Sequence, residues 1–466
     1  MTHFDTNGAP DYRDSPAPTY QQVIARDPIE APASLRQIHP THIEMPRVPR
    51  ERYTSQTFFD LEKERMWSRT WQVACRVEEV REVGDCVLYE SPGASLIIMR
   101  SAPDVIKAFY NGCLHRGMKL CASDTSVNKI RCPYHGMTWN LDGSLQNLPA
   151  RWDFDPVEDS ELALPEARVG LWGGFVFVNH DPASPSLETY LGPLIAEFAD
   201  WSRDDVYLDT RVTKVMEANW KCCIEGFVEA FHVAELHSQA LPFGGDASTQ
   251  YDVWADNGHV SRFCAPTGIP SDQYPQPITE AEIWKATFGA VTGDTDNAPP
   301  LPEGKTARGY LADMNRTELG KVYGQDFSHL TDAEACDPIQ YSLFPNFLLF
   351  KGLPYPFAYR FVPIDNSPDR TRFDFMIFRP KPQDGSDFPE VNQIDLGPDD
   401  TYAASGAFQP WHGLIYDQDC QNLALQQQGL KAGGVKDVML SRYQEVRIRF
   451  LHKTLMEYLD RDSCLK

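Results

Sequence analysis

Two cysteines and two histidines form a pair of closely spaced motifs in the first third of the chain. Cys113 and His115 are spaced as C-x-H, and Cys132 and His135 follow as C-x-x-H. Two thiolates and two imidazoles on paired loops can supply four ligands to one site. Two imidazoles in place of two thiolates raise the potential of a [2Fe–2S] cluster above that of an all-cysteine cluster. The pattern therefore predicts an electron-transfer cluster.

The same four donors could instead hold zinc in a ribbon with two Cys and two His ligands. Zinc motifs more often pair C-x-x-C with H-x-x-x-H, so the spacing here favours the iron–sulfur cluster. The flanking residues favour it too, because Gly117 and Gly136 shape loops whose N–H groups can approach bridging sulfides.

A second group of candidate ligands follows in the segment from Glu229 to His237. On an ideal helix His232 and His237 lie about 140° apart, so they can share a metal only if the helix ends or bulges between them. Since the chain has 12 histidines, a pair at this spacing could also be a coincidence. The corresponding alternative for Glu229 is a solvated helix carboxylate.

Residues 109–145 resemble the Rieske domain of ring-hydroxylating oxygenase α-subunits. They contain C-L-H-R-G and C-P-Y-H-G, followed by L-D-G-S-L. Rieske proteins of respiratory chains carry a cysteine between the Pro and the His of the second motif, where this chain has Tyr134. The resemblance is therefore to the oxygenase branch, and it implies one [2Fe–2S] cluster held by the four residues named above.

The segment from Asn219 to His237 resembles a second motif of that family, N-W-K followed by acid-x-x-His-x₄-His. In the family this motif supplies both histidines of a 2-His-1-carboxylate triad, here His232 and His237. Aligning the family's closing Q-x-G-L on residues 427–430 makes Asp419 the third ligand, whereas Asp417 faces the other side of the helix. Such a triad leaves positions open for O₂ and is typical of non-haem Fe(II).

The resemblance also implies a role for Glu229. In the family this acid links the two metal centres across a subunit boundary. It contacts the mononuclear-site histidine, here His232, and the second cluster histidine of a neighbouring chain, here His135. Glu229 is therefore expected to be the electron bridge between the sites.

Composition limits the classes of partner. The chain has 466 residues, enough for two or three domains, and a net charge of −23, which argues against nucleic acid or an anionic membrane as partner. Its eleven cysteines are scattered, as is usual in a reducing cytoplasm. No signal peptide is evident, and the longest apolar run, residues 171–178, is too short to span a bilayer. A cytoplasmic protein is expected.

The pattern along the chain predicts three parts: an N-terminal arm (1–50), a Rieske [2Fe–2S] domain of short strands (51–180) and a catalytic mononuclear iron domain (181–466). A stretch rich in Gly, Pro, Asp and Thr (241–338) is expected to be a lid or binding insertion. Helices are expected at 54–71, 187–202, 214–236 and 414–431, and the longest strands at 340–351, 356–363 and 371–379.

The fold that the resemblance implies is α+β. An all-β Rieske domain is inserted near the start of a helix-grip type catalytic domain, whose curved antiparallel sheet wraps the helices that bear the iron. The family builds homotrimers, and some members add a small β-subunit.

The activity implied is that of a terminal oxygenase in a multicomponent system. It would use O₂ to hydroxylate, dihydroxylate or demethylate an organic substrate, aromatic or cyclic. The chain has no Rossmann or P-loop motif, so electrons from NAD(P)H would arrive through a separate reductase, with or without a ferredoxin. The alternative is a non-catalytic electron carrier, in which the second group of ligands has no function.

Overall fold

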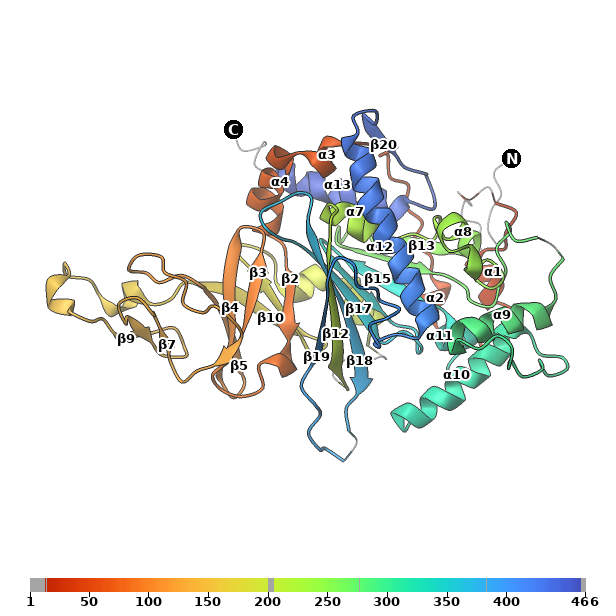
Figure 1. Cartoon of the computed structure of the whole chain (residues 1–466), viewed down its shortest axis with the longest axis horizontal. Helices are drawn as coiled ribbons and strands as arrows, with labels where there is room; N and C mark the ends of the chain where they lie inside the picture. The colour runs from red at the N-terminus through yellow and green to blue at the C-terminus, as the bar shows by residue number, and fades with distance from the viewer. Residues whose placement is uncertain (1–12, 14, 200–204, 276, 383, 462–466) are drawn as a thin grey trace.

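The computed structural model describes residues 13, 15–199, 205–275, 277–382 and 384–461, and it has two parts (Figure 1). An elongated part built almost entirely of strands lies on the left of Figure 1, and a larger part of helices around a sheet lies on the right. Residues 1–12 and 14 of the predicted arm and 200–202 of a predicted helix lie outside the described residues. No helix of the described chain is both long and apolar enough to cross a membrane.

The elongated part contains an antiparallel sheet in the order β2-β11-β10-β5-β4-β3-β6. Its strands are β2 (Gln72–Arg76), β3 (Asp85–Ser91), β4 (Ala94–Ala102), β5 (Val105–Tyr110), β6 (Thr125–Ser126), β10 (Glu166–Trp172) and β11 (Phe175–Asn179). A smaller sheet of β7 (Ile130–Arg131), β8 (Thr138–Trp139) and β9 (Leu145–Asn147) lies toward the far end of this part (Figure 1). The short strands predicted here are confirmed.

The larger part is built on a sheet in the order β13-β14-β15-β16-β17-β18-β12-β19. Its strands are β12 (Val206–Met216), β13 (Gln250–Val253), β14 (Val260–Cys264), β15 (Ile339–Leu343), β16 (Phe347–Phe350), β17 (Phe357–Pro363), β18 (Thr371–Pro380) and β19 (Asn392–Leu396). The prediction of an antiparallel sheet is wrong at one edge. Strand β12 pairs with β18 in antiparallel orientation on one side and with β19 in parallel orientation on the other. The sheet is therefore mixed.

The predicted helix over 214–236 is confirmed only in part. Residues up to Met216 belong to β12, which is rich in Val and Thr and whose middle residues alternate between buried and half-buried, as suits a strand. Two short helices follow, α7 (Trp220–Glu225) and α8 (Val233–Leu236), with an irregular segment between them. The Asn219 side chain starts α7 by accepting the backbone N–H of Lys221.

The stretch 241–338 is more than an insertion. It contributes β13 and β14 to the main sheet, because every residue of both strands is buried and their backbone groups need ladder partners. The rest forms α9 (Glu280–Thr292), α10 (Ala307–Tyr323) and α11 (Asp332–Cys336). Helix α12 (Pro410–Lys431), predicted at 414–431, crosses in front of the sheet (Figure 1).

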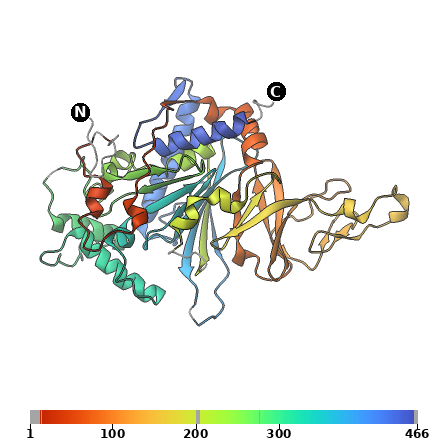
Figure 2. The same ribbon diagram turned by 180° about the vertical axis from the view of Figure 1, so that it is seen from behind.

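The chain enters the larger part before it forms the elongated part. The early elements are α1 (Tyr20–Ile24), α2 (Ala33–Arg36), β1 (Arg47–Pro49), α3 (Glu51–Thr54), α4 (Gln56–Glu62) and a π-helical turn (Lys63–Trp67). Figure 2 shows them in red on the larger part. Tyr53, Phe59 and Trp67 share a hydrophobic core with residues of α7 and of α13 (Val446–Asp460). Strand β1 pairs with β20 (Asp437–Met439).

Candidate metal centres

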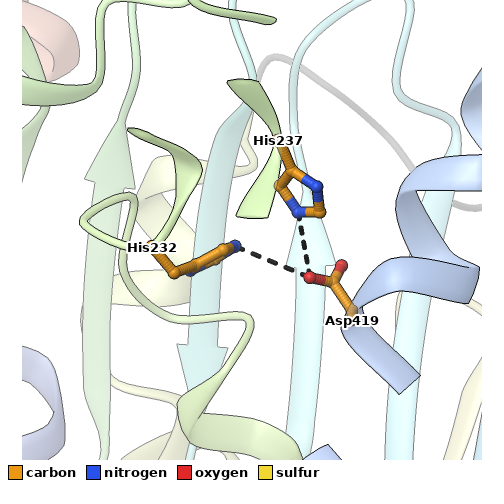
Figure 3. Close-up of side chains that lie close together, drawn as sticks. All are labelled: His232, His237 and Asp419. Carbon is orange, nitrogen blue, oxygen red and sulfur yellow. Dashed lines mark hydrogen bonds and ion pairs between the residues drawn. The ribbon is translucent and has the colours of Figure 1, made fainter. Parts of the chain in front are cut away.

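Three side chains from two distant segments converge in the larger part (Figure 3). Nε2 of His237 lies 2.9 Å from Oδ1 of Asp419, and Nε2 of His232 lies 3.6 Å from the same oxygen. One ligand atom from each residue lies within 4.8 Å of the others. His237 and Asp419 are buried and His232 is half-buried. Two imidazoles and one carboxylate in this arrangement fit a single metal ion, and this donor set is typical of non-haem Fe(II).

A single short helix, α8, lies between the two histidines and ends at the second one, so the pair does not sit on a continuous helix. His232 is the N-cap and His237 the C-cap of α8, and the backbone of His237 has left helical geometry (φ −119°, ψ 47°). The two rings can therefore face one point although their positions would diverge on a continuous helix. Asp419 reaches that point from α12.

The second ring nitrogen of each histidine is held by a neighbouring side chain. Nδ1 of His232 lies 2.6 Å from Oε1 of Glu229, and Nδ1 of His237 lies 2.9 Å from Oε1 of Gln418. Both oxygens are acceptors, so each Nδ1 donates to its neighbour and each Nε2 is left free to bind a metal ion shared with Asp419. Glu229 lies in the irregular segment before α8 and also accepts the backbone N–H groups of Phe231 and His232.

Gln418 is a functional residue that the sequence pattern did not reveal. It sits beside Asp419, and Nε2 of Gln239 donates to its Oε1 at 2.7 Å, which keeps that oxygen turned toward His237. Glutamine next to a carboxylate is unremarkable in a helix, so only the contact between α12 and the segment after α8 identifies its role.

The four predicted cluster ligands lie on two loops of the elongated part. The Cys113 and Cys132 sulfurs are buried, and each accepts the backbone N–H groups of the residues two and three positions further along. His115 and His135 are exposed, with ring centroids 4.8 Å apart. Buried thiolates beside two exposed imidazoles suit a cluster that has cysteines on one iron and histidines on the other.

The two cysteine loops have the same backbone design. Each cysteine N–H donates to the C=O of a methionine, and each cysteine C=O accepts the N–H of a glycine with positive φ. The contacts are Cys113 with Met118 (2.8 Å) and Gly117 (2.8 Å), and Cys132 with Met137 (2.9 Å) and Gly136 (3.1 Å). The glycine φ values are 73° and 78°, which residues with a Cβ rarely adopt.

Two cavities flank the metal-ligand triad. One, of about 540 Å³, is lined by polar groups that include Glu229, His232 and Asp419. The other, of about 260 Å³, is bounded by His237 and by mostly apolar side chains, among them Phe243, Tyr355, Trp411 and Tyr416.

The fold and the two sets of candidate ligands fit a protein that combines a Rieske domain with a mononuclear metal domain. Residues 70–158 match the model of the Rieske [2Fe–2S] domain, and residues 194–461 match that of the ring hydroxylating alpha subunit (catalytic domain). The chain belongs to the ring-hydroxylating oxygenase α-subunit family, as the sequence motifs predict.

Curated relatives include both monooxygenases and dioxygenases. The carnitine monooxygenase oxygenase subunit of Escherichia coli (strain K12) is 32% identical over 193 residues, which are 41% of this chain and 52% of that protein. Biphenyl dioxygenase subunit alpha of Paraburkholderia xenovorans (strain LB400) is 32% identical over 191 residues, 38% of this chain and 41% of that protein. The alignments thus span about half the length of these relatives.

Solved structures of the same fold cover most of this chain. A quaternary ammonium Rieske monooxygenase in complex with L-carnitine has a TM-score of 0.61 at 17% identity and covers 88% of this chain and 95% of its own. Naphthalene 1,2-dioxygenase from Rhodococcus sp. bound to indole has a TM-score of 0.58 at 20% identity, with 89% and 94% covered.

Proposed function

We propose that this chain is the terminal oxygenase of a multicomponent Rieske system. It takes electrons from NAD(P)H through a separate reductase and uses O₂ to hydroxylate, dihydroxylate or demethylate an organic substrate. The observation that carries the proposal is the convergence of His232, His237 and Asp419 beside an apolar cavity, in a chain with a Rieske domain. When bound, the cluster supplies electron transfer and the mononuclear iron supplies O₂ activation.

The residues of the chain have distinct roles in this proposal. Cys113, His115, Cys132 and His135 hold the cluster. His232, His237 and Asp419 hold the iron, while Glu229 and Gln418 fix the orientation of the two rings through their Nδ1 protons. The larger part is proposed to be a helix-grip domain with α12 as the helix that presents Asp419.

The apolar cavity next to His237 is the proposed substrate site. Its aromatic walls exclude water and can orient a ring against the open side of the iron. The compounds after which the relatives are named divide between aromatic compounds and small quaternary ammonium compounds. The walls here support an aromatic or cyclic substrate.

We also propose a head-to-tail homotrimer, with or without a small β-subunit. Within one chain, the sheet that contains β7 and β9 lies at one end of the molecule, away from α8 and α12 in the larger part (Figure 1). The region of the cluster ligands carries exposed apolar side chains, and Phe231 beside His232 is exposed as well. The exposed residues near the cluster are Leu114, Met118, Tyr134, Trp152 and Phe154. A second copy that joins the two surfaces would bring its His135 to Glu229.

The decisive experiment is product analysis with ¹⁸O₂. The purified chain, reconstituted with a reductase and NADH, is supplied with a panel of aromatic, steroid and methylated compounds. Incorporation of ¹⁸O into a product, absent with Asp419→Ala, supports the oxygenase. An electron carrier would instead pass electrons from the reductase to an acceptor equally well in both proteins and would incorporate no ¹⁸O.

A further inference from the structure

One acidic side chain stands out in the wall of the apolar cavity beside His237. Asp246 lines this cavity and is only 5% exposed. Its Oδ1 atom is buried and has no hydrogen-bond partner among the described residues. A buried carboxylate oxygen that lacks a donor is costly, so such groups are rare unless a ligand or water completes them.

The guanidinium of Arg13 donates to the C=O of the neighbouring Ala247 at 2.7 Å, but Arg13 is not part of the cavity wall. Among the described residues that line the cavity there is no Lys or Arg, and burial lowers the pKa of His412, which also lines it. Burial raises the pKa of Asp246, and the neighbouring Ser271 hydroxyl and Ala247 N–H lower it in part. The Oδ1 atom itself has no hydrogen-bond partner among the described residues.

The backbone holds this carboxyl group in a fixed place. Gly244 bridges to Thr267, and the N–H of Gly245 donates to the C=O of Pro266 at 3.1 Å. A Cβ on Gly245 would lie 2.9 Å from Pro266, so only glycine allows this close approach. The N–H of Asp246 donates to the C=O of Gly244 at 2.9 Å. The side chain is thus placed by a rigid turn, as a recognition group requires.

We propose that Asp246 determines substrate specificity by accepting a hydrogen bond from an O–H or N–H group on an otherwise apolar, ring-containing substrate. This inference rests on the proposed function, since it concerns the cavity next to the iron ligands. Aromatic walls such as Trp411 and Tyr416 contact the ring, and Asp246 selects the end that carries the donor. At about 260 Å³ the cavity suits a small molecule.

Hydrogen bonds to a charged group are stronger than those between neutral groups, and a site built around one discriminates strongly against ligands that lack the donor. We therefore expect a ligand with the donor to bind about 10- to 100-fold more tightly than the matching hydrocarbon. A protonated amine gains most if the carboxyl group is ionised, whereas a hydroxyl is preferred if it is neutral.

The test compares indane, indanol and aminoindane as probes of the metal-loaded protein. Their binding is measured by calorimetry for the wild type, Asp246→Asn and Asp246→Leu. The control is Thr287→Val in the same wall, where the threonine hydroxyl already donates to Ile283 O at 2.7 Å. We expect the wild type and the control to prefer indanol or aminoindane over indane, and which of the two binds better identifies the donor. Asp246→Leu should lose the preference, and Asp246→Asn should lose it for aminoindane.

Equal affinity for the three probes in the wild type, including no binding of any, would overturn the inference. So would a preference that persists in Asp246→Leu or, should that variant not fold, a preference for aminoindane that persists in Asp246→Asn. The proposed function is read separately from ¹⁸O incorporation, so selective binding without oxygenation would contradict the oxygenase and leave the recognition by Asp246 established.

Discussion

Asp417 and Asp419 lie two residues apart on α12, and their carboxylates contact different parts of the molecule. Oδ1 of Asp419 lies 2.9 Å from Nε2 of His237. Asp417 instead accepts the backbone N–H groups of Tyr402 at 2.7 Å and Ala403 at 3.2 Å. One carboxylate therefore faces the candidate iron site, and the other fixes the loop that precedes α12.

This difference predicts opposite effects for two substitutions. Asp419→Ala should lose the mononuclear iron and all oxygenation, while the absorption of the cluster stays. Asp417→Asn should keep both metals and lose only stability, about 1–3 kcal/mol for a weakened buried acceptor. Iron and sulfide content, the visible spectrum and thermal unfolding measure these effects. If Asp417→Asn lost the mononuclear iron and Asp419→Ala kept it, the iron ligand would be Asp417 and not Asp419.

The four cluster ligands predict the colour of the protein. The wild type should be brown, with about two irons and two sulfides per chain from the cluster and up to one further iron. Cys113→Ser or His135→Ala should bleach it. Cys75→Ala is the matched control, because Cys75 is a buried cysteine of β2 outside the two cysteine loops. A colourless wild type that contains zinc would contradict the cluster.

Glu229 offers a test of the link between the two metal sites. Its Oε1 lies 2.6 Å from Nδ1 of His232, so Glu229→Gln keeps an acceptor of similar size and removes the charge. We expect both metals to remain bound and steady-state turnover to fall about 10- to 100-fold. Product formed per iron in a single turnover of the pre-reduced protein should change much less. Unchanged steady-state turnover would make Glu229 an ordinary carboxylate.

Mixed subunits test the proposed trimer. His135→Ala and Asp419→Ala should each be inactive alone. After mixing and reassembly at equal amounts, about a quarter of the sites should pair an intact cluster with an intact triad from a neighbouring chain. The recovered activity should therefore approach about a quarter of the wild-type value. Proven mixed trimers without activity would place the electron path within one chain.

Glu225 predicts how stability depends on pH. Burial raises the pKa of Glu225 to about 8, while Tyr53 O–H and His452 bond to its carboxyl group. Between its unfolded pKa of about 4.3 and its folded value, the native state holds a proton that the unfolded state has released. Stability should therefore fall as pH rises from about 5 to about 8, by at most about 5 kcal/mol.

The glutamine variant isolates this contribution. Glu225→Gln stays neutral at every pH, so thermal unfolding should show a smaller decline between pH 5 and pH 8 than the wild type. Glu235→Gln, at an exposed position of α8, is the control and should follow the wild type. Identical slopes for the wild type and Glu225→Gln would show that Glu225 does not titrate in this range.

The sequence predicts motifs and local secondary structure better than it predicts which distant segments pair with each other. The motifs around Cys113 and His232 contain their chemistry within a few residues, and α12 has one long helical pattern. The parallel pairing of β12 with β19 is invisible locally, because strand direction depends on the path of the intervening chain. The predicted helix over 214–236 overlaps the end of β12 at residues 214–216. Where a partly buried strand leads into a helix, the two-residue period of the strand and the 3.6-residue period of the helix are hard to separate.

The core of the larger part joins segments that are made at very different times. Arg52 and His452 are 400 residues apart and in contact, and β1 pairs with β20. During synthesis the elongated part is complete once β11 has emerged from the ribosome, whereas Tyr53 and Trp67 must wait for α13. Until then their apolar surfaces lack the partners that cover them in the folded chain, which makes this interval of synthesis the one most exposed to misassociation.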